Sequence, residues 1–210
     1  YDDVADSWTT KANLNTARAY LAGFSLNGYG YTAGGYTGSE SAVTEKYDDM
    51  TDTWTTKANL NTARFLLSAF SLNGYGYTAG GYNGSTYVGT TEKYDDIANS
   101  WTTKADLNAA RSSLTSFSLN GYGYTAGGYT GSTSVVTEKY DDISNSWATK
   151  ANLNTARYRL AGFSLNGYGY TAGGYTGSTS AVTEKYDDVA DSWTTKANLN
   201  TARAYLAGFS

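Results

Sequence analysis

The stretch SLNGYGYTAGGYTGS at residues 25–39 occurs four times in this chain, and it decides the fold. The other copies begin at Ser71, Ser118 and Ser164 and differ from the first by at most one residue. Each copy places an Asn-Gly pair, a strong signal for the turn of a β-hairpin, between apolar and aromatic residues. Repetition at a fixed interval is typical of architectures in which one structural unit stacks against the next.

The repeat extends beyond this stretch and spans all 210 residues, which we treat as a single domain. The sequence Tyr-Asp-Asp recurs at intervals of 46 or 47 residues, beginning at Tyr1, Tyr47, Tyr94, Tyr140 and Tyr186. The complete units are residues 19–64, 65–111, 112–157 and 158–203, with partial units at 1–18 and 204–210. Because residues 1–25 are identical to residues 186–210, we expect the chain to be part of a longer repeat array.

Each unit contains four short β-prone segments separated by turn residues. In the first unit these segments are AYLAGFSLNG, YGYTAGGY, SAVTEKYDD and WTTKANLN. The last of them alternates in character and carries Lys57, as expected of an outer edge strand. Four antiparallel strands in a meander, repeated in this way, predict the blade of an all-β propeller.

The spacing of glycine and aromatic residues resembles that of the kelch repeat, in which a double glycine is followed by a Tyr and a Trp. The first occurrence is Gly34-Gly35, Tyr47 and Trp54. The pattern recurs at Gly80-Gly81, Tyr94 and Trp101; at Gly127-Gly128, Tyr140 and Trp147; and at Gly173-Gly174, Tyr186 and Trp193. The resemblance implies a β-propeller of four-stranded kelch-like blades, four of them complete, with partial strands at both ends.

Composition limits the chemistry available to the chain. It has no His and no Cys, so the commonest general bases and soft metal ligands are missing, and we expect no catalytic site and no cofactor. The net charge of −4 argues against a nucleic-acid partner, because binding phosphates needs clustered Lys and Arg. The sequence has no apolar run of the roughly 20 residues that a membrane helix needs.

Two recurring polar features have both a structural and a functional interpretation. The turn after Tyr47 carries Asp48, Asp49 and Asp52, which predict side-chain bonds to turn N–H groups, with calcium binding as the alternative. An arginine recurs after each fourth segment, at Arg18, Arg64, Arg111, Arg157 and Arg203. We expect this arginine to stack on an aromatic ring or to donate to loop carbonyls, with sugar or carboxylate binding as the alternative.

The copies differ mainly in two regions, the pair of residues after the arginine and the loop after Gly-Gly-Tyr. In a four-strand meander both regions lie at the same end of the blade, so they share one face of the ring. Loops on a rigid scaffold are where binding residues concentrate. The candidate ligand-binding residues are therefore Tyr20, Tyr36, Phe65, Leu66, Tyr82, Tyr87, Tyr129, Tyr158, Arg159 and Tyr175.

These features predict a non-enzymatic binding or adhesion module that recognises a glycan or a protein. We expect it to lie outside the cell, on a bacterial or viral surface. The alternative is a structural subunit of an extracellular filament or phage tail fibre with no small ligand. Self-association through unpaired terminal strands is a further expectation.

Overall fold

The computed structural model describes residue 1 and residues 3–208. Sixteen strands, and no helix, lie in the described residues. The first two sheets contain β1 (Ala22–Leu26), β2 (Tyr29–Ala33), β3 (Thr44–Asp48) and β4 (Thr53–Lys57), then β5 (Ser68–Leu72), β6 (Tyr75–Ala79), β7 (Thr91–Asp95) and β8 (Ser100–Lys104). The other two contain β9 (Thr115–Leu119), β10 (Tyr122–Ala126), β11 (Thr137–Asp141) and β12 (Ser146–Lys150), then β13 (Ala161–Leu165), β14 (Tyr168–Ala172), β15 (Thr183–Asp187) and β16 (Ser192–Lys196).

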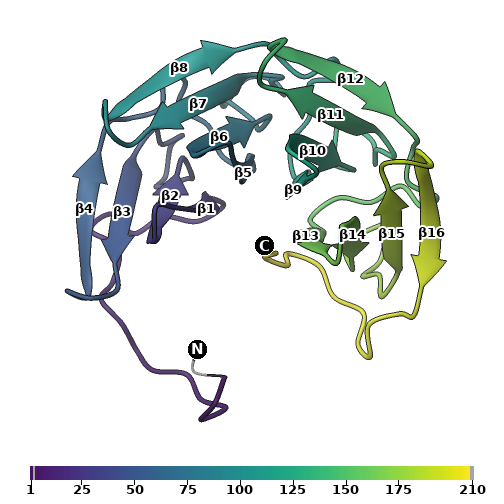
Figure 1. The fold of residues 1–210 in the computed structure, drawn as a ribbon, viewed down its shortest axis with the longest axis horizontal. Coiled ribbons are helices and arrows are strands. Elements are labelled where there is room, and N and C mark those ends of the chain that lie inside the picture. The colour runs from purple at the N-terminus through teal and green to yellow at the C-terminus, as the bar shows by residue number, and fades with distance from the viewer. Residues whose placement is uncertain (2, 209–210) are drawn as a thin grey trace.

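Each sheet is an antiparallel meander in which consecutive strands pair in sequence order. We call the four sheets blades 1 to 4. They lie around a central axis, with the first strand of each innermost and the fourth at the outer rim, and the ring is open between blades 1 and 4 (Figure 1). The expectation of four complete propeller blades is confirmed. That the repeats continue in a longer array stays a prediction.

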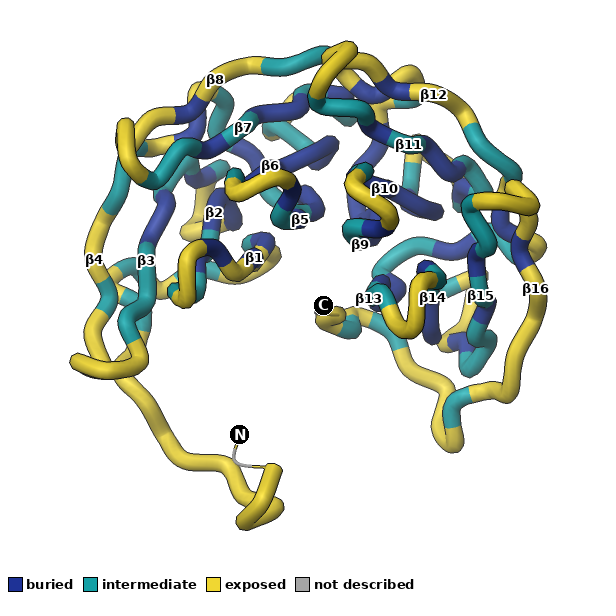
Figure 2. The backbone as a smooth tube through the Cα atoms, viewed as in Figure 1, coloured by how far each residue is buried: buried dark blue, intermediate teal, exposed yellow. Residues whose placement is uncertain are grey.

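The chain ends contribute no strand in the described residues before Ala22 or after Lys196. The partial strands expected there do not form in the described residues, because each terminal segment lacks the other strands of its own unit to pair with. Residues 11–18 instead pack against blade 1. Ala12 N–H donates to Asp52, and the Trp54 indole N–H donates to the Ala12 carbonyl at 2.9 Å. Residue 1 and most of residues 3–18 are exposed (Figure 2).

The hydrophobic core lies between the blades rather than within them. We call the side of a blade that is turned toward the preceding blade its leading face, and the opposite side its trailing face. Between blades 2 and 3, Phe70 stacks on Tyr77 with 5.2 Å between ring centroids and meets Trp147 of blade 3 edge-on at 6.4 Å. Tyr77 packs on Tyr140 at 5.6 Å. The prediction that the repeated Tyr and Trp pack between blades is confirmed.

A buried ion pair also joins each blade to the segment before it. Arg111 lies between blades 2 and 3: its carbonyl accepts from Gly81, and its side chain pairs with Glu138 on β11. Its guanidinium also donates to the Gly127 carbonyl and to the Thr125 hydroxyl at 2.9 and 2.8 Å. The equivalent pairs are Arg18–Glu45, Arg64–Glu92 and Arg157–Glu184, with every side chain fully buried. Burial lowers the pKa of Arg64 to about 10, although Glu92 opposes that shift.

The arginine therefore donates to loop carbonyls, as expected, and also has a carboxylate partner that was not expected. Arg111 lies in the connection between blades 2 and 3 and Glu138 lies on β11, 27 residues further along the chain, so no local pattern connects them. The guanidinium groups of these arginines are paired with glutamates and hold the blades together. None of them is free to bind a sugar or a ligand carboxylate at Arg18, Arg64, Arg111 or Arg157.

A second polar contact between blades involves a lysine and an aspartate. The Lys139 ammonium of blade 3 lies 3.1 Å from Asp188 of blade 4, and the Tyr124 hydroxyl donates to the same carboxylate. Burial by itself raises the pKa of Asp188, but the hydrogen bond from Tyr124 and the contact with Lys139 outweigh it, so the pKa is lowered overall.

We expect the pH dependence of stability to reflect this aspartate. Because the folded-state pKa lies below the unfolded value of about 3.9, the stabilisation is complete above that pH and is lost as the pH falls through the folded-state pKa. Asp188→Asn should therefore be less stable than the parent at pH 6. Between pH 5 and pH 3 it should lose less stability than the parent loses over the same range. Urea unfolding at each pH measures this. Asp49→Asn, at the same repeat position but with a side chain 76% exposed, is the control, and an equal change in both variants would contradict the assignment.

Candidate functional site

The two regions in which the repeats differ lie side by side on one face of the ring. In each unit an isolated β-bridge joins them, as between Phe65 and Tyr82, whose backbone N–H and C=O groups exchange hydrogen bonds of 3.1 and 2.9 Å. The other bridges are Ala19–Tyr36, Ser112–Tyr129 and Tyr158–Tyr175. The predicted sharing of one face is confirmed, and because backbone bonds hold both regions, the side chains there are free to differ.

Eight aromatic side chains on this face form a continuous series of ring contacts, which we call the aromatic arc. Its members are Tyr20, Tyr36, Phe65, Tyr82, Tyr87, Tyr129, Tyr158 and Tyr175. Successive ring centroids are 5.2 to 6.2 Å apart, and the rings are tilted or edge-on. Such pairs contribute roughly 0.5–1.5 kcal/mol beyond the area they bury, so each ring helps to hold its neighbours in place.

Tyr87, in the longer loop of the second unit, completes the arc from the position that Glu40, Thr133 and Thr179 hold in the other units. Phe65 connects Tyr36 to Tyr82, and Tyr158 connects Tyr129 to Tyr175. The third unit has Ser112 at this position, which cannot make a ring contact. There Tyr87 lies 5.4 Å from Tyr82 and 5.8 Å from Tyr129 and takes over the connection. The sequence predicted the members of the arc. It did not predict that Tyr87, from the loop after Gly-Gly-Tyr, replaces the ring that is missing at Ser112.

A second set of variable residues surrounds the mouth of the central opening. We call it the mouth ring, and it contains Tyr20, Leu66, Ser113, Arg159 and Tyr205. Their φ angles lie between 55° and 61°, a left-handed conformation that costs a residue other than glycine roughly 1–2 kcal/mol. Backbone strain of this kind is concentrated at functional sites.

Backbone hydrogen bonds run head to tail around the mouth ring. Leu66 N–H donates to the Tyr20 carbonyl, Ser113 N–H to Leu66, Arg159 N–H to Ser113 and Tyr205 N–H to Arg159, over 2.7 to 3.0 Å. These bonds hold the left-handed conformation without using any side chain. The mouth ring is therefore a fixed backbone on which the side chain can be changed from unit to unit.

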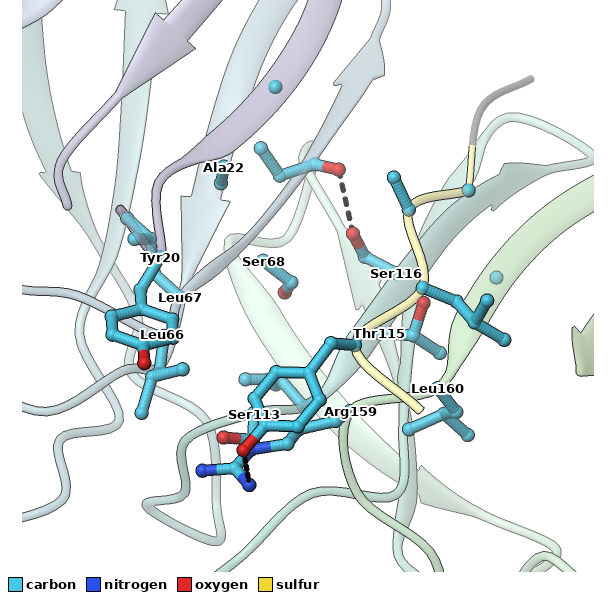
Figure 3. Close-up of a pocket in the computed structure, with 18 of the residues that line it drawn as sticks. Tyr20, Ala22, Leu66, Leu67, Ser68, Ser113, Thr115, Ser116, Arg159 and Leu160 are labelled. Atoms are coloured by element: carbon cyan, nitrogen blue, oxygen red, sulfur yellow. Dashed lines mark hydrogen bonds between the residues drawn. The ribbon is translucent and has the colours of Figure 1, made fainter. Parts of the chain in front are cut away.

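A cavity of about 470 Å³ opens at the mouth ring (Figure 3). Part of its wall is formed by residues at the start of the inner strands, including Ser68, Thr115 and Gly162. The volume is within the range of ligand pockets, which is about 300–1,000 Å³. Arg159 lies at the edge of this cavity beside Ser113 (Figure 3).

The candidate residues thus divide into two neighbouring groups. Leu66 and Arg159 belong to the mouth ring, Tyr20 belongs to both groups, and the remaining candidates lie in the aromatic arc. Ser113 and Tyr205 were not selected from the sequence. They occupy the repeat position of Leu66 and Arg159, and an alignment of the units by this position identifies them.

The aspartate-rich turns have a structural role. In the second unit, Asp95 accepts from the N–H groups of Ile97 and Ala98 at 2.9 and 3.0 Å, as predicted. Asn99, with φ of 47°, accepts from the Tyr94 hydroxyl and from Ala58 N–H of the preceding blade. Either Asp or Asn can supply this acceptor, which accounts for their exchange between units. Among the described residues no group of three or more Asp and Glu side chains is placed to hold a metal ion.

The comparisons with known proteins agree with this architecture. The sequence profile of the Kelch motif matches residues 17–61 and 63–108. The solved structure described as "Structure of YjhT" superimposes with a TM-score of 0.86 at 15% sequence identity, covering 97% of this chain and 77% of that chain. A search of curated proteins found no match to the sequence.

These findings define a β-propeller, and residues 17–61 and 63–108 of this propeller match the Kelch motif. The resemblance deduced from the recurring Gly-Gly, Tyr and Trp is therefore confirmed. The kelch propeller is in general a fold of binding modules, and members commonly bind proteins. No helix in the described part of the chain is long and apolar enough to cross a bilayer.

Proposed function

We propose that this protein is a non-enzymatic binding module that recognises a glycan or a protein through the aromatic arc. The observation that carries the proposal is that the arc is continuous and lies on the face where the repeats differ. Tyrosine presents a flat apolar ring together with a hydroxyl, a combination suited to both kinds of ligand. Several adjacent weak sites on one rigid body add by avidity, which a single repeat could not achieve. The function needs no cofactor, and an extracellular, bacterial or viral surface is the setting that suits adhesion.

Tyr129→Ala tests the arc at its centre. The substitution interrupts the ring contacts to Tyr87 and Tyr158, but the backbone bridge to Ser112 remains. We expect binding to weaken about tenfold, the loss of roughly 1.4 kcal/mol typical of a central aromatic contact, and the melting temperature to fall by several degrees because two ring contacts are lost, while the protein stays folded. A glycan array and a pull-down from surface proteins identify the ligand, and calorimetry then measures the affinity.

Ile143→Ala is the matched control, because Ile143 is 96% exposed and lies in a β11–β12 turn outside the arc. Its affinity should equal that of the parent protein. Equal binding by Tyr129→Ala, or an empty glycan array together with an empty pull-down, would contradict the proposal.

A second candidate function is a structural subunit of an extracellular filament or tail fibre that associates with itself. What favours it is that blades 1 and 4 each leave one face open. Tyr47 and Trp54 on the leading face of blade 1 are only partly buried, and Leu165 on blade 4 is 52% exposed. Micrographs of the native protein that show only separate discs would contradict this function.

A further inference from the structure

Arg159 is a cation that has no anionic partner among the described residues. Its guanidinium lies 5.0 Å from the Tyr158 ring centroid and 4.1 Å from that of Tyr205, and it donates to the Tyr205 hydroxyl. Its Nε is buried and has no acceptor among the described residues. The arginines between blades differ in this respect, because each is paired with a glutamate.

The surroundings of Arg159 do not neutralise it. Among the described residues that line the cavity at the mouth ring, Arg159 is the one charged side chain, and the others are Tyr, Leu, Ala, Gly, Ser and Thr. The cavity therefore carries one positive charge in a partly enclosed space, where solvent screens it less than at an open surface. A carboxylate fits a guanidinium in geometry as well as in charge, because the two planar groups form paired hydrogen bonds.

The mouth ring also limits what the rest of the ligand can be. Its backbone N–H and C=O groups are joined to one another from Tyr20 to Tyr205, so an extended peptide would find few main-chain partners there. What remains available are the hydroxyls and ring faces of Tyr20 and Tyr205, which are 46% and 60% exposed. Hydroxyl groups and the apolar ring faces of tyrosine match the hydroxyls and the C–H surface of a sugar.

We propose that the cavity at the mouth ring binds an acidic sugar, with the carboxylate held by Arg159. The inference rests on the proposed binding function and deepens it by naming a class of ligand. The sugar ring lies against Tyr205, the tyrosine beside Arg159 at the edge of the cavity. In a longer glycan, the neighbouring sugars extend over the aromatic arc.

Calorimetry with methyl glucuronide and methyl glucoside tests the proposal, because the two probes differ in the carboxylate. We expect the protein to bind the glucuronide roughly 10- to 100-fold more tightly, the difference that a charge-assisted hydrogen bond makes. Arg159→Gln should remove this preference at unchanged melting temperature, and Arg159→Lys should retain part of it. Raising the salt concentration should weaken glucuronide binding alone. Lys196→Gln removes one exposed positive charge from β16 and should leave the preference intact.

Several outcomes would overturn the inference. These are equal affinity for the two sugars, no binding of either, or a preference that persists in Arg159→Gln. Tighter binding of an acidic dipeptide than of the glucuronide would show that the ligand is a peptide and that the proposed sugar is wrong. A neutral glycan whose binding depends on Tyr129 but not on Arg159 would leave the binding function standing while this inference fails.

Discussion

Replacing Gly123 with alanine is expected to lower the free energy of unfolding by about 2–3 kcal/mol, the cost of forcing extra volume into a packed core. Gly123 lies on β10, and a Cβ there would be 2.2 Å from Cε2 of Phe70 on the preceding blade. Phe70 cannot move aside, because its ring is stacked on Tyr77 and meets Trp147 edge-on. The substitution therefore separates blades 2 and 3.

Gly30→Ala is the matched control, because Gly30 occupies the same position in the identical strand sequence YGYTA. Blade 1 has no complete blade before it, and the nearest atom to a Cβ on Gly30 is Tyr47 Cβ of its own sheet, at 3.7 Å. This variant should be as stable as the parent or slightly more so, since alanine is about 0.5–1 kcal/mol better than glycine inside a strand. Urea unfolding of both variants measures the difference, and an equal loss in both would place the effect within the strand rather than between blades.

The contrast between these two glycines shows what the sequence could and could not predict. The four strands of a unit, the Asn-Gly turns and the packing of Tyr and Trp between blades follow from patterns within about ten residues. Gly123 has no such pattern. Its requirement comes from Phe70 on another blade, and only the three-dimensional arrangement connects the two residues.

The candidate site divides in the same way. The variable residues identified Tyr158 and Arg159 as a pair, but adjacent residues in the chain have different surroundings in the structure. Tyr158 continues the aromatic arc, whereas Arg159 turns into the mouth ring with a φ of 57°. The left-handed conformation had no signal in the sequence, because Tyr, Leu, Ser and Arg all occupy it and none of them favours it. Hydrogen bonds between the units impose it.

The buried ion pair gives the second large effect. Arg111→Met should lower the free energy of unfolding by about 3–5 kcal/mol, because it leaves Glu138 fully buried without its cation. The Glu138 carboxylate would keep one hydrogen bond, from Asn108 N–H at 2.7 Å, which does not replace a guanidinium. The loss also includes the hydrogen bonds from Arg111 to Thr125 and Gly127. Urea unfolding of the variant and the parent measures the change.

Two further variants distinguish the effect of breaking the ion pair from the effect of replacing an arginine side chain at this repeat position. Arg203→Met changes the same repeat position after blade 4, where Arg203 is exposed, and should alter stability by no more than about 0.5 kcal/mol. Arg111→Met combined with Glu138→Leu removes both charges and should recover a large part of the loss, because an apolar pair can replace a buried ion pair at little cost. If the double variant were less stable than Arg111→Met alone, the uncompensated charge would not be the cause. Stability would then depend on the hydrogen bond that Glu138 accepts from Asn108 N–H, which the double variant also loses.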